Sequence, residues 1–367
     1  MRVLHLLDTI NRGGAEMQAL DVCRNAHKYG IELTFVTAQG GAMEKDFRAS
    51  NAEFIRLSRR LPIDLTLILK LRKIIKDQRI ELVQSYQAVD GLHLYLATLN
   101  LPVKQILSFQ GFISDRKNRQ TSRFLIPRMD ANIVVSKGLM KWLENNDGLQ
   151  TSSNFHVIYN GADQKRLAPS GKFLKKELGL SENVSLFGMI GNFYRDRRKD
   201  QITLCKSLPK VFTKIENAHC IFAGKIEEGA EEKFQECVDF CEKNGITEKV
   251  HFLGGRSDVP DILEALDLFV FSSLHEGLPV AVSESMLANV PMIVSDIEPL
   301  LEASGGGKYA EVFPVQNAAI LSEKILKLLK NTDLREDLAV RAFKFAAENL
   351  SIEAHLRELR KLYNSIL

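Results

Sequence analysis

The chain has 367 residues, of which 45% are hydrophobic and 26% are charged. This composition excludes disordered and fibrous proteins. No apolar run is long enough to span a bilayer, and the length of the chain favours two globular domains. Residues 1–163 contain 22 Lys and Arg against 16 Asp and Glu, whereas residues 164–367 contain 27 against 30. The basic first half indicates an anionic partner on that side, but its excess is too modest to imply nucleic acid.

The chain begins with a short apolar stretch, residues 3–7, which a charge and a turn follow at once. This stretch is too short for a signal peptide and is typical of a first strand. The five cysteines show no disulfide spacing, which is typical of reduced thiols. Both features predict a cytoplasmic protein.

Strand-like runs alternate with segments of helical period through the first half. The predicted strands are 3–7, 33–37, 53–57, 81–85, 105–109 and 131–136, and the predicted helices include 15–29, 64–77, 89–99 and 137–145. Between the first strand and the first helix lies Asn11-Arg12-Gly13-Gly14-Ala15-Glu16. Two glycines before a helix N-terminus let a ligand anion approach unpaired N–H groups, although a simple tight turn explains Gly-Gly equally well.

The alternation restarts after Asn160-Gly161, a turn dipeptide, and the polar stretch that follows it. The predicted strands are then 185–190, 219–223, 249–253, 267–272 and 291–295, and three helices close the chain at 318–330, 334–349 and 352–366. Strand–helix alternation predicts parallel sheets covered on both faces. The pattern therefore predicts two doubly wound α/β domains, residues 1–163 and 164–351.

A basic loop follows the first strand of the second domain, in the run Gly191-Asn192-Phe193-Tyr194-Arg195-Asp196-Arg197-Arg198-Lys199-Asp200. Four cations within five residues, at the carboxyl end of a strand, are suited to phosphate oxygens. A solvated basic loop is the simpler alternative. The predicted position at a crevice between the domains favours an anion site.

A third motif, His275-Glu276-Gly277-Leu278-Pro279, links a strand to a helix that carries Glu284. Pro279 is suited to the start of that helix, and Glu284 then lies about one turn inside it. Carboxylates accept hydrogen bonds from vicinal hydroxyl groups, so the pair indicates sugar recognition. A hydrolase with two catalytic carboxylates is the weaker alternative.

Taken together, these motifs resemble the family 4 glycosyltransferases of the GT-B fold, with two Rossmann-like domains facing a crevice. The resemblance also covers residues 130–136, 157–163 and 250–254, and Glu276 and Glu284 match the family's E-x₇-E pattern. It implies transfer of a hexose-type sugar, with retention, from a nucleotide diphosphate sugar to a glycan or lipid-linked acceptor in cell-surface polysaccharide biosynthesis. The second domain would bind the nucleotide sugar, and the helix at 352–367 would pack back on the acceptor-side first domain.

The resemblance also implies roles for individual residues. Lys199 and Glu276 would be catalytic, with Lys199 on the diphosphate, Glu276 on the sugar and Glu284 on the ribose. The full donor-binding set would be Gly13, Gly14, Asn192, Arg195, Arg198, Lys199, Gly254, Arg256, His275, Glu276, Gly277, Leu278 and Glu284, and Gln110 would lie on the acceptor side. No cofactor or metal is expected, because the chain lacks an Asp-x-Asp motif and metal-ligand spacing.

Three positions depart from the family pattern. Asn192 stands where an Arg is usual, so Arg195, Arg197 or Arg198 would have to supply that charge. Gln110 stands where a His is usual and cannot titrate. The segment 295–299 lacks the usual glycine pair. These departures keep two alternatives open: a nucleotide-sugar 2-epimerase of the same fold and a non-catalytic nucleotide-sugar-binding protein.

The predicted helix 64–77 carries Lys70, Lys73 and Lys76 at helical spacing. Such a helix could lie against the inner face of an anionic membrane, with apolar residues 67, 71, 74 and 75 on its remaining side. An ordinary amphipathic helix whose apolar side packs on the sheet is the simpler alternative. The hypothesis is a peripheral membrane contact and a lipid-borne acceptor.

Overall fold

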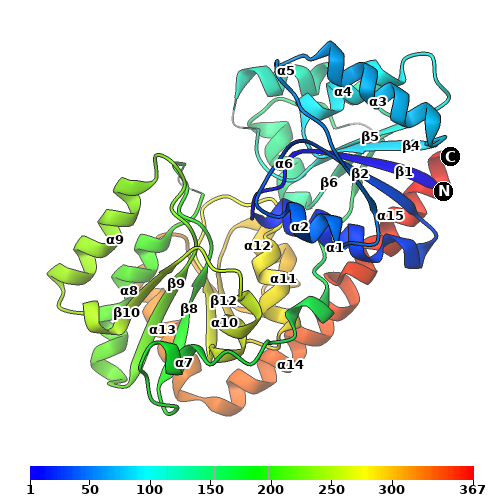
Figure 1. Cartoon of the computed structure of the whole chain (residues 1–367). Coiled ribbons are helices and arrows are strands. Elements are labelled where there is room, and N and C mark those ends of the chain that lie inside the picture. Colours follow the sequence, from blue (N-terminus) through cyan, green and yellow to red (C-terminus); the bar gives the residue numbers. More distant parts are fainter. Residues whose placement is uncertain (114, 152–153, 197) are drawn as a thin grey trace. The chain divides into compact units, whose positions relative to one another are not determined.

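The computed structural model describes residues 1–113, 115–151, 154–196 and 198–367. The chain forms two compact units, Met1–Ala162 with Ile352–Leu367, and Asp163–Ser351 (Figure 1). None of the described helices combines the length and the hydropathy needed to cross a bilayer.

The first unit is a parallel sheet with helices on both faces. Its described strands follow the order β3-β2-β1-β4-β5-β6-β7, and every pairing is parallel. The strands are β1 (Arg2–Thr9), β2 (Glu32–Gly40), β3 (Glu53–Arg56), β4 (Leu82–Ser85), β5 (Lys104–Phe109), β6 (Ala131–Val134) and β7 (Phe155–Val157). The helices are α1 (Gly14–Asn25), α2 (Glu44–Arg48), α3 (Leu65–Asp77), α4 (Ala88–Thr98), α5 (Arg116–Leu125), α6 (Lys137–Asn145) and α15 (Ile352–Ile366).

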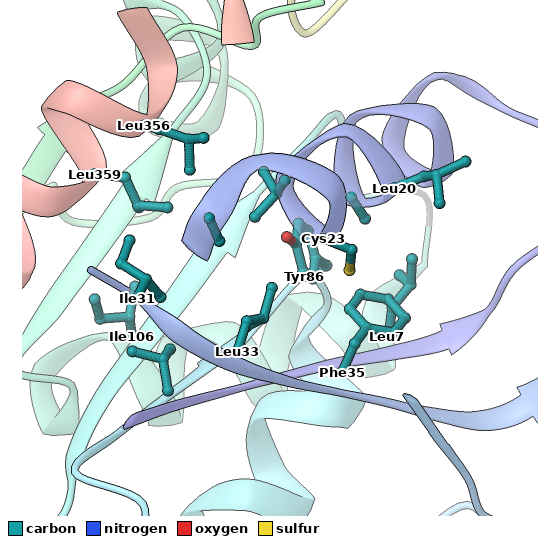
Figure 2. Close-up of a cluster of buried hydrophobic side chains, with 14 of the residues drawn as sticks. Leu7, Leu20, Cys23, Ile31, Leu33, Phe35, Tyr86, Ile106, Leu356 and Leu359 are labelled. Carbon is teal, nitrogen blue, oxygen red and sulfur yellow. The ribbon is translucent and has the colours of Figure 1, made fainter. Parts of the chain in front are cut away.

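The last helix, α15, completes the core of the first unit. Its apolar residues recur every three or four positions, so they share one face of the helix. Figure 2 shows Leu356 and Leu359 of α15 near Ile31 of the first unit, and both leucines are buried. The sheet face under α1 would otherwise expose this apolar surface to water.

A buried chain of hydrogen bonds joins α15 to the sheet. The Tyr363 hydroxyl donates to Gln84 Oε1 at 2.6 Å, so its oxygen accepts from His5 Nε2 at 2.9 Å. His5 Nδ1 is then the acceptor for the Tyr86 hydroxyl at 3.0 Å. Every side chain in this hydrogen-bond network is neutral. Neutral is also the state that a buried histidine favours, because burial lowers the pKa of His5 to about 3.

The second unit repeats the architecture. Its described strands follow the order β10-β9-β8-β11-β12-β13, and every pairing is parallel. The strands are β8 (Ser185–Ile190), β9 (Ala218–Ala223), β10 (Val250–Gly254), β11 (Leu268–Phe271), β12 (Met292–Ser295) and β13 (Glu311–Phe313). The helices are α7 (Leu174–Glu177), α8 (Gln201–Lys214), α9 (Glu231–Lys243), α10 (Val259–Ala265), α11 (Val280–Leu287), α12 (Glu298–Ala303), α13 (Ala318–Lys330) and α14 (Thr332–Asn349).

The predicted α/β class with two Rossmann-like sheets is confirmed. Two short edge strands, β7 and β13, were not predicted, because three residues are too few to show an alternating pattern. The predicted strand 131–136 was two residues too long. Ser136 instead caps α6 by accepting a hydrogen bond from Leu139 N at 3.0 Å.

Candidate active site

The predicted donor motifs of the second unit follow neighbouring strands of its sheet. The basic loop follows β8, and the Glu276 loop follows β11, which pairs directly with β8. Because both strands run parallel, their carboxyl ends meet at the same edge of the sheet. The two motifs therefore meet there, and residues 199 and 273 form an isolated backbone bridge.

Lys199 and Glu276 form the centre of the site. Lys199 Nζ lies 2.5 Å from Glu276 Oε1, and only about a tenth of each side chain is exposed. The Ser273 hydroxyl lies 2.6 Å from the same carboxylate oxygen. Below the ammonium lies the Phe271 ring, whose centroid is 4.0 Å from Nζ. The two residues predicted to be catalytic are thus in direct contact.

Two features of its surroundings, burial and the contact with Glu276, shift the pKa of Lys199 in opposite directions. Burial lowers the pKa of the Lys199 ammonium below its ordinary value, and Glu276 opposes this shift by favouring the charged form. A buried cation with a single close carboxylate is poised to exchange or share that partner with an incoming anion. This is the electrostatic property that a diphosphate site requires.

The other cations of the basic loop differ in their surroundings. Arg198 donates to both carboxylate oxygens of Asp196 and stacks over the Tyr194 ring at 4.7 Å, and the Asp196 hydrogen bonds raise its pKa. Arg195 is exposed and, among the described residues, has no carboxylate partner. Arg197 lies outside the described residues.

Asn192 fastens its loop to the next one. Its Oδ1 accepts from Lys225 N at 3.1 Å, and its Nδ2 donates to Glu227 Oε1 at 3.2 Å. Both side-chain groups of Asn192 are used within the protein. Its predicted role in donor binding would be indirect, through the shape of the loop.

Glu284 lies on α11, which begins directly after the cap residue Pro279. Its Oε1 accepts a hydrogen bond from Arg166 at 2.7 Å, and both side chains are about nine-tenths buried. Glu276 and Glu284 thus have different cationic partners. Arg166 was not predicted, because 118 residues separate it from Glu284 and no local pattern marks it.

The remaining predicted donor residues of the second unit have mixed surroundings. Gly254 has a φ of +64° and accepts from Gly224 N at 2.8 Å, which joins the loops after β9 and β10. Arg256 is held by Glu177 and Asp258, and these carboxylates raise its pKa. His275 is half-buried, with its backbone N–H near Arg198 O, whereas Gly277 and Leu278 are buried beside Glu276.

The predicted residues of the first unit also follow strands. Gly13 caps α1 in an extended conformation, and a Cβ added there would lie 2.6 Å from Glu16 Oε2. The Glu16 carboxylate therefore lies over the helix start at Gly14, where an anion was predicted. Gln110 follows β5 and donates to Ser108 Oγ at 2.9 Å, while its buried Oε1 has no partner among the described residues.

Two family models match the chain in sequence. The first, described as Glycosyltransferase Family 4, matches residues 12–166, and the second, Glycosyl transferases group 1, matches residues 171–345. Together they cover most of both units and every predicted donor residue.

Curated relatives of the chain include bacterial glycosyltransferases. N-acetyl-alpha-D-glucosaminyl L-malate synthase of Bacillus anthracis is 22% identical, over 83% of this chain and 80% of the relative. UDP-Gal:alpha-D-GlcNAc-diphosphoundecaprenol alpha-1,3-galactosyltransferase of Escherichia coli is 24% identical, over 64% of this chain and 62% of the relative. The putative glycosyltransferase EpsF of Bacillus subtilis is 25% identical, over 80% of this chain and 79% of the relative.

Solved structures share the fold along the whole chain. HepE of Anabaena, solved in complex with UDP and glucose, is 18% identical with a TM-score of 0.87, and all of both chains is covered. WaaG, described as a glycosyltransferase involved in lipopolysaccharide biosynthesis, is 15% identical with a TM-score of 0.73, over 98% of this chain and 99% of WaaG. With both family models, the relatives and the Lys199–Glu276 site in agreement, the chain belongs to the family 4 glycosyltransferases of the GT-B fold.

Proposed function

We propose that this glycosyltransferase moves a hexose-type sugar, with retention, from a nucleotide diphosphate sugar to a lipid-linked glycan of cell-surface polysaccharide biosynthesis. The observation that carries the proposal is the buried Lys199–Glu276 contact at the carboxyl edge of the second sheet. HepE was solved with UDP-glucose, and two relatives are named for acceptors on diphosphoundecaprenol, which supports both substrate classes.

The charge that develops on the diphosphate during transfer explains why a cation such as Lys199 is suited to this site. Cleavage of the bond between sugar C1 and the phosphate oxygen leaves a further negative charge on the departing diphosphate, on the phosphate that carried the sugar. Fixed cations and N–H dipoles directed at that oxygen stabilise it. Lys199 would supply the nearest cation, and Glu276, once released from Lys199, would accept hydrogen bonds from sugar hydroxyl groups. An acceptor hydroxyl group would attack C1 from the same face, steered by the departing phosphate, which would take up the hydroxyl proton.

Release of nucleoside diphosphate tests this function against its two alternatives. Purified protein is incubated with UDP-glucose, UDP-galactose, UDP-GlcNAc and UDP-GalNAc, with and without diphosphoundecaprenol-linked GlcNAc. A transferase releases UDP faster with the acceptor and extends the lipid-linked glycan. A 2-epimerase gives an altered sugar without an acceptor, and a binding protein gives neither, so either result would contradict transfer.

A peripheral membrane contact through α3 belongs to the same proposal. The apolar side of α3 is not available for it, because Leu67, Leu71 and Ile75 are buried in the core beneath the helix. A membrane contact of α3 would therefore have to use the opposite, basic side of the helix. Lys70, Lys73 and Lys76 are exposed on the outer side, so they could still face an anionic surface.

Exposed leucines support the contact at the other end of the helix. Leu61, Ile63, Leu65 and Leu69 are 61%, 53%, 72% and 67% exposed, and Leu65 and Leu69 lie one turn apart on one face. Large apolar side chains gathered on a surface mark an interaction site. Apolar residues followed by a row of lysines are suited to an anionic bilayer, which offers hydrocarbon beside negative headgroups.

Vesicle co-sedimentation tests this contact. We expect binding to phosphatidylglycerol-containing vesicles at low salt, and loss of about a hundredfold in affinity when Lys70, Lys73 and Lys76 become Gln, since each contributes about 1 kcal/mol. Leu65→Ser with Leu69→Ser should weaken binding even at high salt. Lys206, Lys210 and Lys214, an exposed row on α8, form the matched Gln control. Equal sedimentation of parent and both α3 variants would contradict the contact.

A further inference from the structure

The loop that follows β8, residues 191–199, is held by the segment that follows β9. Phe193 N donates to Lys225 O at 2.9 Å, and Glu227 N donates back to Phe193 O at 3.0 Å. The Phe193 ring is buried and meets the Phe234 ring of α9 edge-on, with centroids 5.3 Å apart. The shape of the basic loop thus depends on α9 as well as on its own residues.

Lys233 lies in the first turn of α9 and donates to the same loop. Its Nζ lies 3.2 Å from Tyr194 O and also donates to Asp196 O. A cation in the first turn opposes the helix dipole, so α9 itself gains nothing from a lysine there. The side chain is accounted for by the two loop carbonyl groups that it binds.

The direction of these carbonyl groups affects how the loop can bind an anion. A carbonyl oxygen repels a phosphate, whereas an N–H group attracts it. In a planar trans peptide, the N–H of the next residue points opposite to the carbonyl. With Tyr194 O directed at Lys233, the N–H of Arg195 therefore points away from α9. The ammonium also adds positive charge near Arg198 and Lys199.

We propose that Lys233 is a positioning residue for the donor diphosphate: it turns the carbonyl groups of Tyr194 and Asp196 toward α9, so that the loop offers the N–H group of Arg195 and its cations to the phosphates. This inference rests on the proposed function. It predicts a defect confined to the diphosphate, because the carbonyl groups that Lys233 binds belong to the loop after β8, whereas Glu276 and Glu284 follow β11.

The test compares nucleoside diphosphates with monophosphates by calorimetry. The panel is UDP, GDP, CDP and ADP with their monophosphates, measured on the parent and on Lys233→Met, which keeps an unbranched side chain but removes the charged donor. We expect the parent to favour a diphosphate, and Lys233→Met to lose about tenfold of that preference while its monophosphate affinity and melting temperature stay unchanged. Lys233→Arg, which keeps the charged donor, should restore the preference.

Lys175 provides the matched control. Its ammonium also donates to two backbone carbonyl groups, those of Glu182 and Val184 at 3.1 and 2.9 Å, but before the start of β8. Lys175→Met should leave the diphosphate preference unchanged. Suppose that the parent prefers a diphosphate, and that Lys233→Met keeps this preference or loses as much affinity for the monophosphate as for the diphosphate. Either result would overturn the role of Lys233 but leave the proposed function in place. Binding of no nucleotide by the parent would overturn the proposed donor as well.

Discussion

Lys199 combines a short contact to a carboxylate with burial, whereas a surface lysine such as Lys361 makes its carboxylate contact while exposed to solvent. The burial strengthens every electrostatic interaction that it makes, including one with a phosphate. Burial lowers the pKa of the ammonium, and its partner Glu276 opposes that shift by favouring the charged form. At the scale of single residues, the site is therefore an ion pair that the donor would have to open.

Lys199→Ala should cripple transfer while the protein stays folded. Removing one partner of a buried charge pair costs about 2–5 kcal/mol, which corresponds to a loss of roughly 30- to several thousand-fold in kcat/KM. Circular dichroism and melting temperature control for folding. A variant with near-parental kcat/KM would move the phosphate site elsewhere.

Glu276 and Glu284 should differ in the ligand that each variant loses. Glu284→Ala removes the partner of Arg166 and should chiefly weaken binding of the free nucleoside diphosphate. Glu276→Ala should weaken the nucleotide sugar more than the free nucleotide, because its proposed ligand is the sugar. Calorimetry with both ligands checks the split, and equal losses in the two variants would refute the assigned roles.

At the scale of elements, α15 shows how a helix from the end of the sequence becomes part of the first unit. Its apolar face completes the core, and Tyr363 links it to β1 and β4 through His5 and Gln84. Such links are specific, since each buried polar group has its partner within the chain of hydrogen bonds.

Tyr363→Phe should destabilise the first unit by about 1–3 kcal/mol, because Gln84 Oε1 and His5 Nε2 lose a buried partner. Urea unfolding, followed by the fluorescence of the only tryptophan, Trp142 of the first unit, measures the loss. Tyr95→Phe is the control, because no hydrogen bond of its hydroxyl is found within the described residues. Equal stability of the two variants would show that the link contributes nothing.

At the scale of the whole molecule, buried histidines should set the acid limit of stability. Burial lowers the pKa of His5 to about 3 and that of His355 to about 4, and His355 Nδ1 donates to Tyr159 O at 2.8 Å. Unfolding exposes both rings, so below pH 6.5 the unfolded chain binds protons that the folded chain does not.

The free energy of unfolding of the first unit should therefore fall as the pH drops from 6.5 toward 4. At pH 5, which is about 1.5 units below the pKa of an unfolded histidine, each buried histidine should lower the free energy of unfolding by about 2 kcal/mol. Urea titrations at pH 7 and pH 5 check this, with His355→Gln expected to show a smaller fall and exposed His27→Gln an unchanged one. A fall that is the same in all three proteins would assign the acid sensitivity elsewhere.

Transfer should not require a divalent metal ion. The reasons are the missing Asp-x-Asp motif and the cations between residues 195 and 199, which would neutralise the diphosphate in place of a metal. Turnover in excess EDTA should match turnover in magnesium. Activity that disappears with EDTA and returns with magnesium or manganese would contradict this account.

Local patterns in the sequence were sufficient to predict the class of fold and the residues at the centre of the candidate site. Strand–helix alternation and caps such as Asp64 depend on near neighbours, so the local pattern encodes them. The same holds for Lys199, Glu276 and Glu284, because parallel strands bring loops after their carboxyl ends to one edge.

The pairing of side chains that lie far apart in the sequence could not be predicted without the folded structure. Lys199 pairs with a carboxylate 77 residues away and Glu284 with an arginine 118 residues away, and both pairings depend on the order of elements in space. For the same reason, packing decided that the apolar side of α3 covers the sheet while Leu65 and Leu69 stay exposed. A helical period predicts that a helix has an apolar side, but the neighbouring elements decide which side they cover.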